Sequence, residues 1–245
     1  MTDRAVSDVI GYVLVFSLII ATVGIVTAVG FSTIEDRQRD ERINNVERAF
    51  DVFAANVEDV YRGGAPSRAT EIRLSGGTLQ YGEPVTITVR DADDPTINHS
   101  MAVTPLVYTE GNSDVVYAGG AVFRDEPQGS AMLRGPPFVL REDRSMLPFV
   151  RTTRSVGRTE VGGKRTVRIE SSRTDVNATT RSELANGGTL ELVVDSPRQT
   201  AWDGYLGAQA DRVDGWEYDE TNSTLSFETN ELAVPRSRVR LRFVT

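Results

Sequence analysis

The stretch that decides the fold is residues 9–34, VIGYVLVFSLIIATVGIVTAVGFSTI, which contain no charged residue. As a helix it is about 39 Å long, because each residue adds about 1.5 Å. A helix of ~20 apolar residues is enough to cross the hydrocarbon core of a bilayer. The stretch is longer than the apolar centre of a secretory signal peptide, and charged helix formers rather than a small-residue cleavage pattern follow it. The sequence therefore predicts a membrane-inserted helix.

The helical pattern continues beyond the apolar stretch. Apolar residues recur every three or four positions, while charged residues occupy the other faces; the apolar positions are Ile43, Val46, Phe50, Phe53, Val57 and Val60. This is the period of an amphipathic helix. Gly63, Gly64 and Pro66 favour its end, since Gly caps helices and Pro cannot continue them. We expect one helix, transmembrane over residues 6–34 and amphipathic over 35–62; a signal anchor with a short stalk helix is the alternative.

After a Gly/Pro linker at residues 63–69, the apolar period changes from 3.6 to 2, which is typical of β-strands. Turn sequences rich in Gly and Pro separate the candidate strands. These strands are residues 71–74, 78–81, 85–90, 102–109, 115–118, 121–124, 131–134, 138–141, 147–153, 166–170, 189–195, 215–218, 224–228 and 239–244. One helix interrupts them, with Ser196 as its cap, Pro197 at its first position and its end at Ala210. Trp202 of this helix is expected to pack on the sheet.

The predicted fold class is therefore α+β. A long N-terminal transmembrane and amphipathic helix precedes a mainly antiparallel, β-sandwich-like domain over residues 70–245. The chain has 245 residues, enough for one sizeable domain beyond the membrane helix.

The composition is acidic, with 35 Asp and Glu against 27 Lys and Arg and a net charge of -8. Lys164 is the single lysine. An acidic, lysine-poor surface suits a halophilic archaeal protein, because carboxylates keep a protein hydrated in high salt. The chain has no Cys, so the external domain has neither disulfides nor thiolate metal sites and depends on its apolar core.

No catalytic or cofactor motif emerges from the sequence. His99 is the single histidine and lies in a turn-like segment, residues 91–100, so a catalytic triad or an ordinary histidine metal site is not expected. Asp91, Asp93 and Asp94 offer oxygen ligands for Ca²⁺, but a solvated acidic turn is favoured because the ligand set is incomplete. The expectation is a protein that is not an enzyme and binds no cofactor.

Three sequons place candidate glycosylation sites at Asn98, Asn177 and Asn222, each in an expected polar loop. Residues 141–173 are rich in basic side chains, namely Arg141, Arg144, Arg151, Arg154, Arg158, Lys164, Arg165, Arg168 and Arg173. Solvent-facing positions on alternating strands explain this pattern; docking to an acidic partner is the alternative. Nucleic acid is not the expected partner, because no aromatic residues interleave with the arginines.

The segment Arg4-Ala5-Val6-Ser7-Asp8-Val9-Ile10-Gly11 resembles the start of haloarchaeal type IV pilin-like proteins. The resemblance covers about the first 35 residues. It implies that residues 1–5 are a leader, that Arg4 and Ala5 are recognised by a prepilin-type peptidase, and that the cut leaves Val6 as the mature N-terminus. Asp8 stands where the related major pilins commonly have Pro, so the resemblance leaves a major or a minor subunit open.

The resemblance further implies extraction of the apolar helix by a pilus assembly machinery and packing against other pilin-like subunits in a filament. Gly11, Gly24 and Gly30 allow close helix approach, with lipid-facing flexibility as the alternative. Asp8 pairs with a neighbour's freed amine at Val6 or lies among the lipid headgroups. The rival interpretation is an uncleaved, single-pass anchor whose external β domain acts as a binding or receptor-like protein.

Overall fold

The computed structural model describes residues 2–174 and 178–244. It describes the side chains of all these residues except 2–9, 28–36, 178 and 185–187. The chain divides into two compact units, Met1–Asn44 and Asn45–Thr245, and each is described by itself. We refer to the second unit as the head.

The helix α1 runs from Thr2 to Tyr61 and so belongs to both units. It corresponds to the helix expected from the apolar stretch and the amphipathic pattern. In the first unit, all side chains of Ile10–Thr27 are exposed. In the head, the expected apolar positions of α1 are buried, and these are Val46, Phe50, Phe53, Val57 and Val60. The same helix thus carries an exposed apolar part and a part with one buried face.

Glycine ends α1. The N–H of Arg62 still donates to the carbonyl oxygen of Glu58 at 2.8 Å, which continues the helical pattern for one residue. Gly64 has a φ of 74°, a left-handed conformation that Gly adopts without strain. The β structure then begins at Ser67, inside the segment expected to be a linker. Ser67 already pairs with Ser172 on the neighbouring strand.

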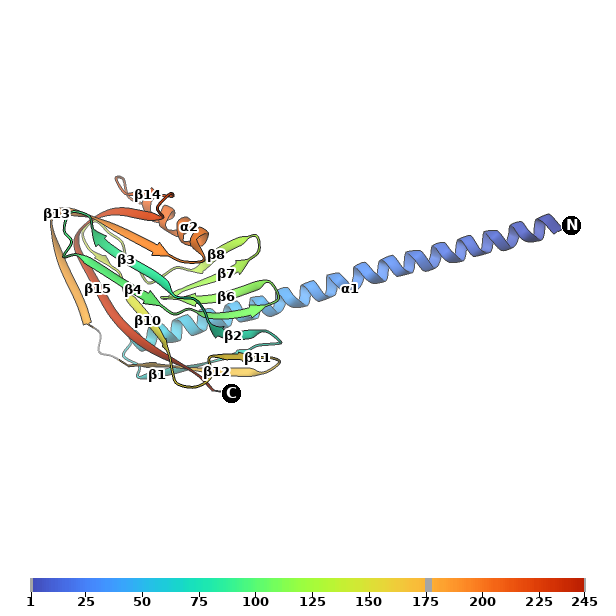
Figure 1. Ribbon diagram of the computed structural model, residues 1–245, viewed down its shortest axis with the longest axis horizontal. Helices are drawn as coiled ribbons and strands as arrows, with labels where there is room; N and C mark the ends of the chain where they lie inside the picture. Colours follow the sequence, from blue (N-terminus) through green and yellow to red (C-terminus); the bar gives the residue numbers. More distant parts are fainter. Residues whose placement is uncertain (1, 175–177, 245) are drawn as a thin grey trace. The chain divides into compact units, whose positions relative to one another are not determined.

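The head contains two sheets, as Figure 1 shows. The larger consists of β1 (Ser67–Arg73), β3 (Val85–Asp91), β4 (Asn98–Val103), β9 (Ser145–Met146), β10 (Phe149–Arg154), β12 (Thr166–Arg173), β13 (Ala178–Asp195), β14 (Glu217–Asp219) and β15 (Thr224–Val244). Its strand order is β1-β12-β15-β13-β3-β4, with β9, β10 and β14 also paired to β15. Only β9 and β10 among these described pairs run parallel to their neighbour.

The smaller sheet has the order β11-β2-β5-β6-β7-β8 and is antiparallel throughout its described pairs. Its strands are β2 (Thr78–Tyr81), β5 (Leu106–Glu110), β6 (Ser113–Ala118), β7 (Ala121–Glu126), β8 (Gly129–Arg134) and β11 (Glu160–Gly162). Together with α1, the two mainly antiparallel sheets confirm the α+β class with a β-sandwich-like head.

Several strand boundaries differ from the sequence-based expectation. The expected strand at residues 102–109 is two strands in different sheets, β4 and β5, separated by Thr104 and Pro105. The expected strands at 224–228 and 239–244 are one strand, β15, because buried apolar residues such as Leu232 and Val234 continue the pattern between them. The expected strand at 138–141 is reduced to a single bridge between Val139 and Met146.

The second helix, α2 (Gln199–Ala210), begins two residues later than expected from Pro197. Arg198 occupies the N-cap position, and no side chain caps the helix. Ser196 is not the cap, because its hydroxyl oxygen accepts a hydrogen bond from the N–H of Arg198 at 3.1 Å and so closes a turn before the helix. The expected end at Ala210 is correct.

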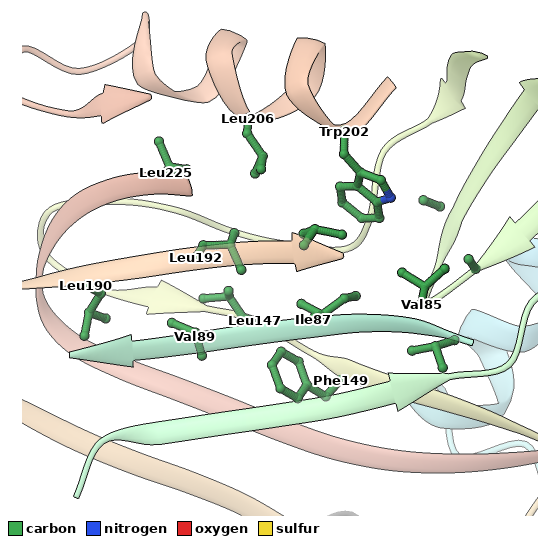
Figure 2. Packing of buried hydrophobic residues seen from close by; sticks show 14 of the residues in the cluster. Val85, Ile87, Val89, Leu147, Phe149, Leu190, Leu192, Trp202, Leu206 and Leu225 are labelled. Carbon is green, nitrogen blue, oxygen red and sulfur yellow. The ribbon is translucent and has the colours of Figure 1, made fainter. Parts of the chain in front are cut away.

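Figure 2 shows how α2 covers the larger sheet. Trp202 and Leu206 point from the helix toward Leu192 of β13 and Ile87 of β3. Trp202 is fully buried, and its ring centroid lies 5.6 Å from that of Phe123 on β7, so its ring also contacts the smaller sheet. The prediction that Trp202 packs on the sheet is therefore confirmed.

The head part of α1 is held by apolar and ionic contacts. Phe53 is fully buried, and its ring meets that of Tyr117 on β6 edge-on at 5.1 Å between centroids. On the helix flank, Arg124 of β7 reaches Glu47 at 3.1 Å. Arg134 of β8 forms ion pairs with both Asp51, at 2.8 Å, and Glu58, at 3.0 Å, of the helix. The amphipathic part of α1 is thus an integral element of the head.

Candidate functional site

The apolar part of α1 is the first candidate surface. Ile10–Thr27 is long and apolar enough to cross a membrane, and none of its side chains is buried within the chain. Burying one large apolar side chain stabilises by about 1.5–3 kcal/mol, so a surface of this kind favours lipid or other apolar helices over water. Around Gly11 and Gly24 a Cβ atom would meet nothing within 4 Å. The side chains of Arg4, Ala5, Val6 and Asp8 and the surroundings of Gly30 lie outside the described residues.

The nine basic residues of the segment 141–173 are all exposed, but they come from separate elements. Arg144 lies before β9 and forms an ion pair with Glu231 at 2.8 Å. Arg158, Lys164 and Arg165 lie in the connections on either side of β11. Two members of the segment, Arg151 of β10 and Arg168 of β12, instead face outward on the larger sheet beside β15.

The larger sheet carries an arginine-rich surface that the sequence analysis did not identify. Along β15 the residues at odd positions from 237 to 243 are buried, and those at even positions are exposed arginines. Neighbouring strands add further arginines on the same side. We define the arginine face as Arg151, Arg168, Arg236, Arg238, Arg240 and Arg242. The alternation R-x-R-x-R-x-R at residues 236–242 is the signal that was available in the sequence.

The register explains how strands far apart in the sequence build this face. Arg151 of β10 stands beside Arg238 of β15, and Glu170 of β12 stands beside Arg242. Like charges directly opposite each other on neighbouring strands destabilise a sheet, so the Arg151–Arg238 pair opposes the pairing of β10 with β15. Among the described residues, neither Arg151 nor Arg240 forms an ion pair with an acidic side chain. The arrangement leaves positive charge available to a partner.

Glu170 is the acid embedded in the arginine face. Nε of Arg242 donates to its Oε2 at 3.0 Å, and Arg168 approaches Oε1 at 3.5 Å. The hydrogen bond from Arg242 and the charges of both arginines hold the pKa of Glu170 below its ordinary value. Glu170 therefore stays ionised and partly offsets the two arginines around it.

An open groove of about 580 Å³ lies along the arginine face where β1, β12 and β15 meet. Its lining combines guanidinium groups with small hydroxyl side chains, and the residues are Ser67, Arg68, Ala69, Ser155, Arg168, Glu170, Ser172, Arg240 and Arg242. Guanidinium groups bind carboxylates and other oxyanions through paired N–H donors, and serine hydroxyls add further donors. The groove can therefore receive acidic side chains or other anionic groups.

The structure describes two of the three candidate glycosylation sites, and both are exposed. Asn98 lies on β4, where it pairs with Arg90 of β3, and is not in the expected loop. Asn222 lies in the turn between β14 and β15, and its Nδ2 donates to Asp219 at 2.7 Å. Asn177 lies outside the described residues.

The carboxylates of the acidic turn before β4 accept hydrogen bonds from backbone N–H groups of the same turn. Oδ1 of Asp91 accepts hydrogen bonds from the N–H groups of Asp93 at 2.8 Å and Asp94 at 3.2 Å. Oδ1 of Asp94 accepts from the N–H of Thr96 at 2.9 Å. In the described residues, no group of three or more His, Asp or Glu is arranged to hold a metal ion. These carboxylates stabilise the turn.

His99 lies on β4 and is 8% exposed, which corrects the expectation of a turn residue. The turn ends earlier because the N–H of Ile97 donates to the carbonyl oxygen of Asp94 at 3.1 Å. Nη2 of Arg236 lies 3.3 Å from Nδ1 of His99. Burial, and after it the charge of Arg236, lowers the pKa of His99. A neutral ring can accept the hydrogen bond from Arg236, whereas a protonated ring would face it with like charge.

We expect stability to fall in a His99-dependent manner below pH 6.5. The unfolded chain binds a proton near a pKa of about 6.5, whereas the folded chain binds it only at lower pH. The contribution of His99 to the free energy of unfolding is thus fully present above pH 6.5. It decreases as the pH falls from 6.5 to the lower pKa of His99 in the folded chain. Since His99 is the single histidine, His99→Asn should remove this part of the decrease. The measurement is the melting temperature of the full chain in detergent from pH 7.5 to 5.5; parallel profiles of the two proteins would contradict the expectation.

Comparison with known proteins gives two matches. The family described as "Family of unknown function (DUF7289)" matches residues 4–242. An uncharacterized protein of Archaeoglobus fulgidus is 34% identical over 110 residues, which are 45% of this chain and 32% of that protein. The match therefore spans about a third of the relative's length. No solved structure matches the chain.

Proposed function

The chain belongs to the family of unknown function DUF7289, and we propose from its own residues that it is a type IV pilin-like subunit of an archaeal surface filament. In this role residues 1–5 are the leader that a prepilin-type peptidase removes, so that Val6 becomes the mature N-terminus. The apolar part of α1 then holds the chain in the cell membrane as a single span with the head outside. The pilus assembly machinery finally packs this helix against those of other pilin-like subunits.

The composition of α1 along its length carries the proposal. A membrane anchor needs only an apolar helix of ~20 residues. Here the apolar part, exposed over Ile10–Thr27, continues in the same helix as the segment whose buried face belongs to the head. A filament subunit uses both parts, because the apolar part must leave the lipid and pack against other helices while the head stays attached to it. Nothing in this role requires a catalytic residue or a cofactor.

Specific residues have roles in the proposal. Open space around Gly11 and Gly24 lets a neighbouring helix approach closely, and Gly30 adds a third small position. Asp8 pairs with the freed amine at Val6 of a neighbouring subunit, which avoids an unpaired carboxylate in an apolar filament core. With the head outside the cell, the exposed Asn98 and Asn222 are within reach of a glycosylation machinery, and Asn177 is a further candidate by its sequon alone.

The decisive test is the mature N-terminus. The full chain is produced in an archaeal host with a prepilin-type peptidase and in the same host lacking the enzyme, and the N-terminal peptide is identified by mass spectrometry. We expect a start at Val6 that disappears without the peptidase. Ala5→Leu, which enlarges the small residue before the cut, should also prevent processing, whereas the matched change Val9→Leu should not. An intact leader in the peptidase-containing host would contradict the proposal.

A single-pass, uncleaved anchor with a binding head is the second candidate, and the arginine face favours it. An external surface with several arginines suits the capture of an anionic partner. In that case the leader remains on the chain in both hosts. Membrane association then persists without filament formation.

A further inference from the structure

The head carries a second charged surface, of opposite sign to the arginine face. Residues 211–220 connect α2 through β14 toward β15 and contain a single basic residue, Arg212. Their acidic residues are all exposed, and these are Asp211, Asp214, Glu217, Asp219 and Glu220. We call residues 211–220 the acidic segment. Among the described residues, Asp214 and Glu217 form no ion pair.

The acidic segment is fixed to the head rather than loosely attached. Trp216 is buried, and its ring meets that of Phe227 on β15 edge-on at 5.5 Å between centroids. Glu217 lies on β14, which pairs with β15 through Ser226. Oδ1 of Asp219 accepts the N–H of Thr221 at 2.8 Å and so closes the following turn. The carboxylates are therefore presented from a defined surface, as the guanidinium groups are on the arginine face.

The two surfaces lie at opposite ends of the head. Figure 1 shows α2 and β14 at the upper end, whereas β1, β12 and the last residues of β15 lie at the lower end. A surface that matches a different surface at the far end of the same molecule produces head-to-tail contacts, which extend into chains when the rotation does not close. One copy can thus contact two others, one through each end.

We propose that the arginine face of one head binds the acidic segment of the next copy of this chain. The inference rests on the proposed filament role and deepens it by naming a contact between heads. Arg151 and Arg240, which form no ion pair with an acid among the described residues of their own copy, meet acids of the neighbouring copy. Glu170 forms an ion pair with Arg168 and accepts a hydrogen bond from Arg242. The face therefore carries both signs of charge, and this pattern determines how the neighbouring copy is aligned on it.

A second copy fits this face better than nucleic acid does. The outward positions beside β15 are Arg151 and Thr153 on β10, and Arg168, Glu170 and Ser172 on β12. None is aromatic, whereas single-stranded nucleic acids are bound by stacking bases on aromatic side chains. Glu170 would repel a phosphate backbone, but it is compatible with a protein surface that also carries Arg212. The charges that complement the face are already present in the same chain.

Charge reversal tests the contact in the full chain. The face variant is Arg151→Glu/Arg240→Glu, and the segment variant is Asp214→Arg/Glu217→Arg; none of these four side chains forms an ion pair among the described residues. Two differently tagged copies are produced in one host, solubilised in detergent at about 0.1 M salt and recovered through one tag. Since like charges across an interface oppose binding strongly, each variant should recover its own second copy at least about tenfold less efficiently than the original chain.

The informative sample is the mixture of the two variants. The reversed face of one variant then complements the reversed segment of the other, so co-recovery should return to within about twofold of the original chain. Raising the salt to about 1 M, where the screening length is about 3 Å, should weaken recovery in both the original pair and the mixture. Matched control reversals at exposed sites elsewhere on the head, Arg158→Glu/Arg165→Glu and Glu83→Arg/Asp143→Arg, should leave recovery unchanged.

Failure of the mixture to recover, while each variant still folds with an unchanged melting temperature, would overturn the contact. The face variant could instead lose binding to an anionic polysaccharide column and keep its self-association. That result would assign the arginine face to an acidic polymer and would also overturn the contact between heads. The proposed filament role is judged separately by the start at Val6. If the chain is processed to start at Val6 but charge reversal does not change co-recovery, the filament role stands and only the contact between heads is refuted.

Discussion

Phe53→Ala is expected to lower the free energy of unfolding of the head by about 3–5 kcal/mol, the cost of deleting a buried aromatic ring and leaving a cavity. Phe53 has no exposed surface, and it contacts Tyr117 of β6 edge-on at 5.1 Å and Phe50 at 6.3 Å between ring centroids. The ring therefore links the head part of α1 to the smaller sheet. Its loss removes apolar contacts on both elements at once.

Val52→Ala is the matched control for this prediction. Val52 precedes Phe53 on the same helix but is 54% exposed, so its truncation should change stability by less than about 0.5 kcal/mol. The measurement is denaturant unfolding of the full chains in the same detergent, followed by tryptophan fluorescence from the buried Trp202 and Trp216. Equal midpoints for Phe53→Ala and Val52→Ala would contradict the packing of α1 described above.

The double substitution Ile19→Arg/Val23→Arg is expected to abolish membrane insertion. Each arginine near the centre of a spanning helix costs about 2.5–3.5 kcal/mol on insertion scales, so two cost about 6 kcal/mol in addition to the apolar contribution that is lost. The two positions are four residues apart and lie on one side of the helix. Both side chains are exposed, at 54% for Ile19 and 58% for Val23, so the change leaves the fold of the head untouched.

Alkaline extraction of isolated membranes measures this outcome. The original chain should remain in the membrane pellet, and the arginine variant should appear in the soluble fraction. Ile19→Leu/Val23→Leu keeps the apolar character and should remain with the membrane. If the arginine variant also resisted extraction, the apolar part of α1 would not be the anchor.

Local sequence patterns predicted the helices well, because their signals are contained within a few turns. The charge-free stretch of residues 9–34 and the apolar positions from Val46 to Val60 led to α1 within a few residues of its limits. The start of α2 was missed by two residues, because Ser196 and Pro197 favour a helix start and an isolated turn equally well. Such boundaries depend on which local hydrogen bond forms.

The strands were predicted less well, because their limits depend on partners distant in the sequence. β15 is one strand of 21 residues rather than two, since β13, β12 and β10 pair with successive parts of it. β11 was not expected at all; it is a strand of three residues that exists through pairing with β2. His99 was expected in a turn for the same reason. It lies on β4 instead, because β4 pairs with β3.

The sequence by itself determined the apolar part of α1, its amphipathic continuation and the β-rich character of the head, because each follows from the periodicity of neighbouring residues. Only the tertiary structure decided where charge gathers. Arg151, Arg168 and Arg236–Arg242 are spread over about 90 residues of sequence, and strand pairing puts them on one face. Strand register and the choice of the buried face depend on long-range packing, so the arginine face and its acidic counterpart at the other end of the head arise only from the folded chain.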